Sequence, residues 1–177
     1  LLDPANAVSV TLKRPQKPLP EPAPETSTKT VGGSSSGGSS NSPASGDLAG
    51  VSVTTTPGSP HWGGGADIEE QFVTPFLADY GISPGSGKRT PAENAAAGGS
   101  PTSDHLTTNT TSSARDYPTG DGAEAANALG KAMGRTSGSV GTFDRFSIEV
   151  DGHSFSVQIL WAVPDHYDHI HVGIQLA

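Results

Sequence analysis

The first third of this chain limits where a folded domain can form. Residues 32–46 are almost entirely Gly, Ser and Asn, and five prolines stand within residues 15–24. The first composition is typical of a flexible linker and the second of an extended polyproline II spacer, because neither offers apolar side chains to bury. An alternating Val-Ser-Val-Thr-Leu run at residues 8–12 indicates a short strand that pairs outside this domain. We therefore expect an extended arm and flexible linker over residues 1–59 and a folded domain over residues 60–177. Two interpretations of the arm stay open: a tether that lets a domain search around an anchor, or plain disorder.

The overall composition excludes several classes of protein. The 177 residues carry a formal net charge of −8 and include no cysteine. Without cysteine there is no disulfide framework, thiolate metal site or Cys nucleophile, so imidazole and carboxylate would have to hold any metal, which suits Zn²⁺. The acidic balance disfavours nucleic acid and anionic membranes as partners. The longest apolar stretches are too short to cross a bilayer, so we expect no membrane insertion.

Two segments of the expected domain have the spacing of helices. Apolar side chains at helical intervals predict a helix over residues 66–80, with a break or kink at Pro75. A second helix is predicted over residues 121–134, where Asp121 would cap the N-terminus with Glu124 as its capping-box partner.

Three strands are predicted after these helices. Residues 146–150 and 155–161 flank Asp151-Gly152, a dipeptide typical of a type I′ hairpin turn. Residues 169–176 alternate in polarity and form the third strand. The order of elements predicts an α+β domain in which helices flank a small antiparallel sheet.

The last predicted strand carries two histidines on one face. Because side chains alternate along a strand, His169 and His171 point to one side while Ile170 and Val172 point to the other. The two aliphatic residues can then join the core while both imidazoles face a cleft. A single histidine usually has a structural role, but this pair stands next to Asp168 and has a distant Ser-Asp-His at residues 103–105. The combination indicates a metal site of His and Asp ligands.

Four segments resemble a known family when taken together. They are Ser-Gly-Lys-Arg-Thr-Pro-Ala-Glu-Asn at residues 86–94, Gly-Gly-Ser-Pro-Thr-Ser-Asp-His-Leu at 98–106, Ala-Arg-Asp at 114–116 and Asp-His-Ile-His at 168–171. In this order they resemble the zinc D-alanyl-D-alanine carboxypeptidase-like peptidases of the Hedgehog/D,D-peptidase type. That family includes D,D-dipeptidases and the L-alanyl-D-glutamate endolysins of phages. The resemblance implies metal-dependent cleavage of a peptide bond next to a D-amino acid in peptidoglycan.

The resemblance also implies a role for each matched side chain. The implied zinc ligands are His105, Asp116 and His171. The implied catalytic residues are Asp168, as general base, and Arg89, which binds and polarises the substrate carbonyl. The implied substrate-binding residues are Ser103, His169 and Arg89. These roles agree with the chemistry of the residue types, since three ligands leave a zinc ion one position for a water whose proton a carboxylate can accept.

The spacing of the first two implied ligands departs from the family pattern. Ten residues rich in Thr and Ser separate His105 from Asp116, which is longer than the usual spacing. The extra residues could form a loop that still returns Asp116 to the metal, or they could mark a site that no longer turns over. The alternative function is therefore a catalytically inactive structural or wall-binding phage tail module that retains the peptidase fold.

Three features are similar to domains of phage tail and related cell-wall proteins. They are the Trp-Gly-Gly sequence at residues 62–64, the long His-to-Asp spacing, and the ending His-Tyr-Asp-His-Ile-His-Val-Gly. This similarity implies a virion tail or an extracellular, cell-wall location. The implied partners are bacterial peptidoglycan and other phage tail proteins, the latter contacted by the N-terminal arm.

Overall fold

A computed structural model describes residues 47–135, 140 and 143–177 of the chain. The expected strand at residues 8–12, the Pro-rich spacer and the Gly/Ser linker lie outside these residues. The helical segments are η1 (Trp62–Gly64), α1 (Gly65–Ile68), η2 (Glu69–Val73), α2 (Thr74–Ala78), α3 (Pro91–Ala96) and α4 (Ala123–Ala132). The strands are β1 (Asp47–Leu48), β2 (Val51–Ser52), β3 (Ser112–Pro118), β4 (Phe146–Val150), β5 (His153–Leu160) and β6 (His169–Leu176). Among the described helices, none is both long and apolar enough to cross a membrane.

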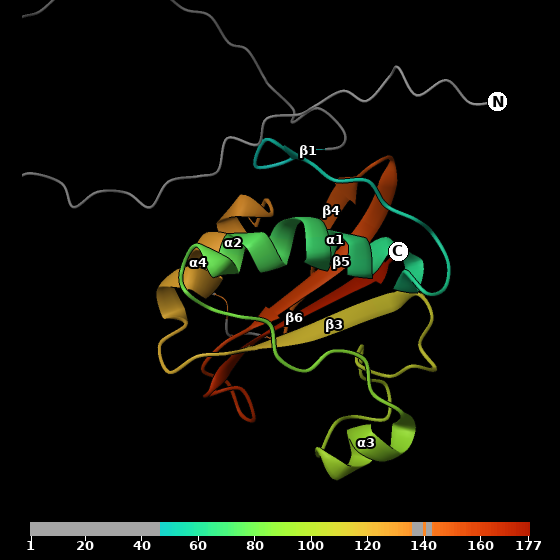
Figure 1. Cartoon of the computed structure of the whole chain (residues 1–177), viewed down its shortest axis with the longest axis vertical. Helices are drawn as coiled ribbons and strands as arrows, with labels where there is room; N and C mark the ends of the chain where they lie inside the picture. Colours follow the sequence, from blue (N-terminus) through green and yellow to red (C-terminus); the bar gives the residue numbers. More distant parts are fainter. Residues whose placement is uncertain (1–46, 136–139, 141–142) are drawn as a thin grey trace, which may run out of the picture. The chain divides into compact units, whose positions relative to one another are not determined.

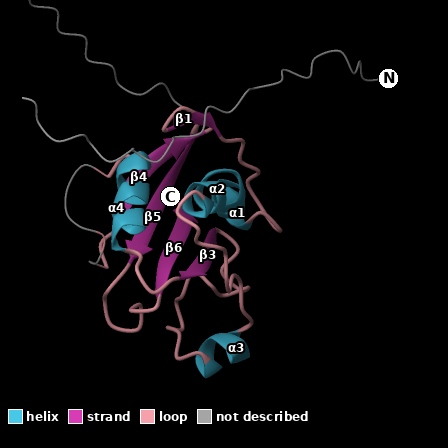
Figure 2. Ribbon diagram, turned by 60° about the vertical axis from the view of Figure 1, so that its left-hand side comes forward, coloured by secondary structure: helices cyan, strands magenta, loops and turns pink. Residues whose placement is uncertain are grey.

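The centre of the domain is a four-stranded sheet in the order β3-β6-β5-β4, with every neighbouring pair antiparallel. α1, α2 and α4 pack over one face of this sheet, and α3 lies apart from it (Figures 1 and 2). Each strand contributes one row of side chains to the shared core: Tyr117 from β3, Ile148 and Val150 from β4, Val157 and Ile159 from β5, and Ile170, Val172 and Ile174 from β6. The expected α+β class with a small antiparallel sheet and flanking helices is confirmed.

The three predicted strands are present, and a fourth was missed. Asp151 and Gly152 have positive φ angles of 51° and 75°, as a type I′ turn requires, and join β4 to β5. β6 covers the predicted range, 169–176. The missed strand is β3, whose Ser-Ser-Ala-Arg-Asp-Tyr-Pro sequence has no β-branched residue. It lies at the edge of the sheet and ends on a proline, a position that edge strands tolerate.

The predicted first helix is an interrupted one. η1, α1, η2 and α2 follow one another without a gap, and η2 is a π-helical turn in which the Thr74 N–H bonds to the Glu69 carbonyl. This wide turn ends at Val73, and Pro75 follows in the first turn of α2, where a proline is tolerated. Ile68, Phe72 and Leu77 are buried as their spacing predicts.

The second predicted helix forms over a shorter range than expected. α4 begins after Gly122, which makes no side-chain cap, so the expected capping box of Asp121 and Glu124 is wrong. The reason is close packing at the start of the helix. A Cβ on Gly122 would lie 2.8 Å from the Trp161 ring and 2.9 Å from Ile170, and the helix starts where this contact allows.

The packed domain begins before the boundary expected at residue 60. Leu48 and Val53 are 5% and 3% exposed and belong to the main core. The next residues are held by side chains of the domain, since the Thr55 N–H donates to Asp151 at 2.9 Å and the Thr56 N–H donates to Asp67 at 2.7 Å. The boundary at residue 60 therefore falls inside the packed region.

A buried carboxyl group lies between the interrupted helix and β3. Glu69 is 2% exposed, accepts a hydrogen bond of 2.9 Å from the Ser113 hydroxyl, and has Arg115 Nε at 3.7 Å, too far for a hydrogen bond. Its other oxygen has no partner among the described residues. Burial raises the pKa of Glu69 to about 7, against the weaker opposing effects of Ser113 and Arg115.

Glu69 should make stability fall as the pH rises from 4.5 to 7. In that interval the unfolded chain has lost the proton that the folded chain still binds, so the folded state is disfavoured, and above pH 7 the effect is constant. Glu69→Gln removes this titration. Relative to wild type, the variant should gain about 3 kcal/mol between pH 4.5 and 7, at 1.4 kcal/mol per pKa unit. Urea unfolding of both proteins across this range is the measurement, and parallel curves would show that Glu69 ionises normally.

Two neighbouring valines test whether the residues before position 60 belong to the domain. Val53→Ala should cost about 2 kcal/mol, because two buried methyl groups are removed and a cavity is left. Val51→Ala is the matched control, since Val51 is only partly buried, and it should cost clearly less. Thermal or urea unfolding gives both values. Equal and negligible effects would restore the boundary near residue 60.

Candidate metal centre

Two of the three implied ligands are neighbours across a strand pair. Asp116 of β3 stands directly opposite His171 of β6 in the antiparallel register. Their side chains share the sheet face turned away from the helices, because Tyr117 and Ile170 occupy the helix-facing row. The pairing of the two strands thus places a carboxylate beside an imidazole.

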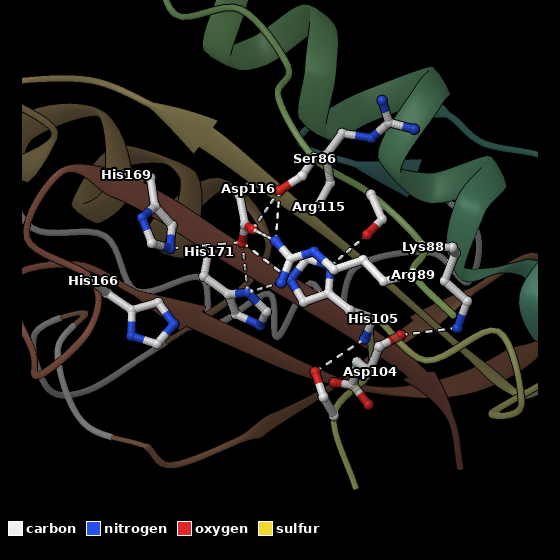
Figure 3. Close-up of polar contacts among 12 residues, drawn as sticks. Ser86, Lys88, Arg89, Asp104, His105, Arg115, Asp116, His166, His169 and His171 are labelled. Atoms are coloured by element: carbon white, nitrogen blue, oxygen red, sulfur yellow. Dashed lines mark hydrogen bonds and ion pairs between the residues drawn. The ribbon is translucent and has the colours of Figure 1, made fainter. Parts of the chain in front are cut away.

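The third ligand reaches the same point from a loop. His105 lies in the loop between α3 and β3. Two backbone hydrogen bonds with Arg89 hold this part of the loop: the Arg89 N–H donates to the His105 carbonyl at 2.6 Å, and the Thr107 N–H donates to the Arg89 carbonyl at 2.8 Å. Arg89 and Leu106 form an isolated bridge there. Figure 3 shows the His105 ring beside Asp116 and His171.

The three ligand atoms form a nearly equilateral triangle. His105 Nε2 lies 3.1 Å from Asp116 Oδ1 and 3.2 Å from His171 Nδ1, and His171 Nδ1 lies 3.1 Å from the same carboxylate oxygen. Tetrahedral zinc with bonds of about 2.0–2.1 Å separates its ligands by about 3.3 Å. These three buried residues could therefore hold a metal ion, and the distances fit one face of a tetrahedron.

Two of the three candidate ligands, His105 and Asp116, are oriented by further contacts. His105 Nδ1 lies 2.7 Å from the Gly87 carbonyl, an acceptor, so this nitrogen carries the proton and leaves the Nε2 lone pair facing the site. Asp116 Oδ2 accepts a hydrogen bond of 2.8 Å from the Ser86 hydroxyl and another from Arg89 Nη2. Asp116 therefore presents its free oxygen, Oδ1, to the two imidazoles.

A glycine makes room beside His171. A Cβ on Gly173 would lie 2.5 Å from Asp104 Oδ2 and 3.2 Å from His171 Nε2. Only glycine lets the buried Asp104 carboxylate approach the strand here, and Arg145 pairs with that carboxylate from across the cleft.

The charge states in the site suit a cation. Burial alone would raise the pKa of Asp116, but its close contacts with His105 and His171 outweigh burial and hold its pKa far below the usual range. Burial lowers the pKa of His171, which keeps that imidazole neutral with a lone pair available. One carboxylate oxygen and two imidazole nitrogens are a donor set that suits zinc when no thiolate is present.

Arg89 and Ser103 both border the site. The Arg89 guanidinium is already engaged, because Nη2 donates to Asp116 and to the Ser86 hydroxyl at 2.6 Å. The Ser103 hydroxyl accepts a hydrogen bond of 3.2 Å from the His105 N–H, and the residue lines the cleft.

Asp168 and His169 form a pair at the edge of the site. The Asp168 side chain is 91% exposed, and its carboxylate lies 2.7 Å from His169 Nδ1. The other ring nitrogen, His169 Nε2, faces inward and lies 3.7 Å from Asp116 Oδ1. In this arrangement the imidazole of His169 faces the candidate ligands, and Figure 3 shows its ring beside Asp116.

The site opens into a cleft of about 670 Å³. Its lining includes the three ligands, His169, and both Arg89 and Arg145. His166 joins the wall, with its ring centroid 5.4 Å from that of His171 and 6.4 Å from that of the exposed Phe143.

Three supporting residues were missed by the sequence analysis. Ser86 and Lys88 fall inside the family-like segment 86–94, yet no spacing rule gives them a role, and Arg145 lies in no motif. The structure gives them roles through contacts with Asp116, with the backbone near His105 and with Asp104, respectively. Such contacts join residues far apart in sequence, and a lysine or serine in a Gly-rich loop is not by itself a signal.

Comparison with protein-family models, with curated proteins and with solved structures found no match for this chain.

Removal of one ligand should abolish tight metal binding. His171→Ala removes a buried nitrogen that could bind the metal. Loss of a residue that only supports a ligand lowers metal affinity by up to ~100-fold, so loss of a ligand itself should weaken Zn²⁺ affinity by more than that. His153→Ala is the matched control, since this histidine begins β5 opposite Val150, outside the site. Competition with a chromophoric chelator measures both affinities. Zinc binding by His171→Ala at wild-type strength would rule out the assigned triad.

Proposed function

We propose that this chain contains a zinc-dependent peptidase domain that cleaves a peptide bond next to a D-amino acid in bacterial peptidoglycan. The observation that carries the proposal is the buried triangle of His105, Asp116 and His171 at the floor of an open cleft. A purely structural metal site is normally closed by a fourth protein ligand, whereas a catalytic one keeps a position open. Among the described residues, only these three side chains form such a group.

A zinc ion held there supplies Lewis-acid polarisation of a carbonyl oxygen and a water that loses its proton near neutral pH. The chain's own side chains would handle that proton. His169 Nε2 points toward the ligands, and Asp168 accepts from Nδ1, which sets the tautomer with a free Nε2 lone pair. His169 can thus take up a proton and pass it to a leaving amine, and the exposed Asp168 stabilises the imidazolium and connects it to solvent.

Arg89 contributes positive charge beside the ligands. Its guanidinium neutralises Asp116 Oδ2 and lies on the cleft wall, so a carbonyl oxygen that gains negative charge near the ligands meets a fixed cation. Because Arg89 also holds Asp116 in place, its removal should affect both metal binding and rate.

The choice of peptidoglycan rests on the family resemblance of the four motifs. The setting follows from the same resemblance: a phage tail or an extracellular location at the bacterial cell wall. In such a setting the Pro-rich and Gly/Ser-rich segments would tether the domain, and the arm would contact other tail proteins. The domain would then search the wall around its anchor.

A second candidate is a wall-binding tail module without turnover. It is favoured by the pairing of Arg89 with Asp116 and Ser86, which leaves this guanidinium fewer donors for a substrate than a free arginine would have. A module of this kind would bind zinc and muropeptides but release no product.

The activity test compares two aspartates of one loop. Asp168→Asn should lower peptidoglycan hydrolysis by roughly 10²-fold, the contribution of a positioned acid–base pair, while zinc binding is retained. Asp165→Asn is the matched control, because Asp165 lines the same cleft but has no bond to His169, and it should retain most of the activity. Release of free amines from purified muropeptides, with and without Zn²⁺, is the measurement.

Two results would contradict the peptidase. A wild-type protein that binds zinc and muropeptides but releases no amine from any D-amino-acid-containing substrate would establish the wall-binding module instead. Activity that is equal with zinc and with excess chelator would dissociate hydrolysis from the metal centre.

A further inference from the structure

Lys88 is bonded to the backbone at three points. Its Nζ donates to the carbonyl oxygens of Asp104 at 2.9 Å, Asn109 at 2.9 Å and Ser112 at 2.8 Å. An ammonium group has three N–H donors, so these bonds use all of them. Figure 3 shows the Lys88 side chain reaching from its loop toward the backbone of Asp104.

The three carbonyls belong to one segment of the chain. Asp104 comes directly before the ligand His105, Asn109 lies within the Thr/Ser-rich loop, and Ser112 begins β3, the strand that carries the ligand Asp116. The ammonium thus ties together the beginning, middle and end of the loop that separates the first two ligands. Other backbone bonds hold single parts of the loop: Arg89 bonds to the backbone of His105 and Thr107, the Asn109 N–H donates to the Leu106 carbonyl at 3.0 Å, and the Leu176 N–H donates to the Thr111 carbonyl at 2.9 Å.

The environment keeps this cation in place. Nζ lies 4.3 Å from the centre of the Trp62 ring, so an aromatic face covers a side that the carbonyls leave open. Burial lowers the pKa of Lys88 to about 8, against the opposing effects of Asp104 and Glu69, and the ammonium therefore keeps its third proton at neutral pH. Hydrogen bonds from a charged, partly desolvated donor are the stronger ones.

We propose that Lys88 is a positioning residue for the metal centre: its ammonium closes the lengthened loop and so sets His105 at bonding distance from the metal that Asp116 and His171 share. The inference rests on the metal centre of the proposed function and not on any particular substrate. It explains how a spacing of ten residues between two ligands is compatible with a site only a few ångströms across. Lys88 itself touches neither metal nor substrate.

The geometry makes lysine hard to replace. Three oxygens surround a compact tetrahedral ammonium, and a planar guanidinium presents its donors in a rigid fork that cannot meet all three at these distances. Methionine keeps the apolar stem against Trp62 but has no donor. The series Lys, Arg, Met therefore loses the bonds in steps.

The experiment measures Co²⁺ affinity, the Co²⁺ absorption spectrum and backbone hydrogen exchange in the full chain. Lys88→Met should weaken Co²⁺ binding by roughly 10–100-fold, as expected for loss of a group that orients a ligand. Its cobalt spectrum should change, and the amides of Leu106, Thr107 and Asn109 should exchange faster while those of β5 do not. Lys88→Arg should fall between wild type and Lys88→Met. Lys131→Met, an exposed lysine in the last turn of α4, is the matched control and should match wild type.

Each outcome decides the matter. A folded Lys88→Met protein with wild-type affinity, spectrum and loop exchange overturns the proposal. A general loss of stability in urea with unchanged cobalt affinity also overturns it, because Lys88 would then be only structural. If Lys88→Met does not fold, Lys88→Arg decides: intermediate affinity with faster loop exchange supports the role, and wild-type values overturn it. A wild type that binds no Co²⁺ refutes the metal centre itself, and with it the assigned role, whereas loss of muropeptide turnover alone leaves both intact.

Discussion

The antiparallel pairing of β3 with β6 is the constraint on which the site depends. It sets Asp116 opposite His171, and a shift of one residue would turn one of the two side chains toward the helices. The register is held by apolar residues on the other face, where Tyr117, Ile170 and Val172 are fully buried. Packing of the apolar face therefore fixes the strand register, and the register in turn fixes the geometry of the residues on the opposite, polar face.

A buried carboxylate next to two imidazoles needs positive charge. Asp116 obtains it on one oxygen from Arg89, supported by Ser86, and presents the other oxygen to the imidazole nitrogens. Lone pairs of a carboxylate and of ring nitrogens that face each other at close range are costly in a buried place unless a proton or a cation lies between them. A metal ion would relieve this repulsion, and the three side chains could hold one.

The segment from α3 to β3 shows how a domain tolerates a long connection between two ligands. Flexible residues cost entropy when they are ordered, and Thr/Ser-rich loops bury little apolar surface in return. Here the backbone carbonyls of the loop bind a lysine ammonium, and the backbone around His105 bonds to Arg89. Neighbouring residues of one short stretch thus serve different parts of the same site: Gly87 orients the His105 ring, Lys88 closes the loop, and Arg89 holds Asp116.

The sequence by itself determined the local features. Asp151-Gly152 specified the hairpin because both residues accept positive φ, and the alternation of β6 placed His169 and His171 on the polar face and Ile170 in the core. The resemblance of four motifs to a peptidase family also named His105, Asp116 and His171 as candidate ligands, and these three side chains lie together in the structure. Local rules failed where a contact overrode them, as at the start of α4, where Gly122 packs against Trp161 and no capping box forms.

Only the tertiary structure decided the remaining features, because they depend on pairing between distant segments. β3 has weak strand propensity and exists as a strand through its bonds to β6. Residues 47–56 belong to the domain because Leu48 and Val53 pack into its core. Composition could not predict this, since these residues directly follow a Gly/Ser-rich segment. Likewise, the turn of Asp168 toward His169 and the three carbonyls around Lys88 follow from where the backbone passes. Residue types and spacing name the groups available for a metal site, but the distances between them are set by packing elsewhere in the domain.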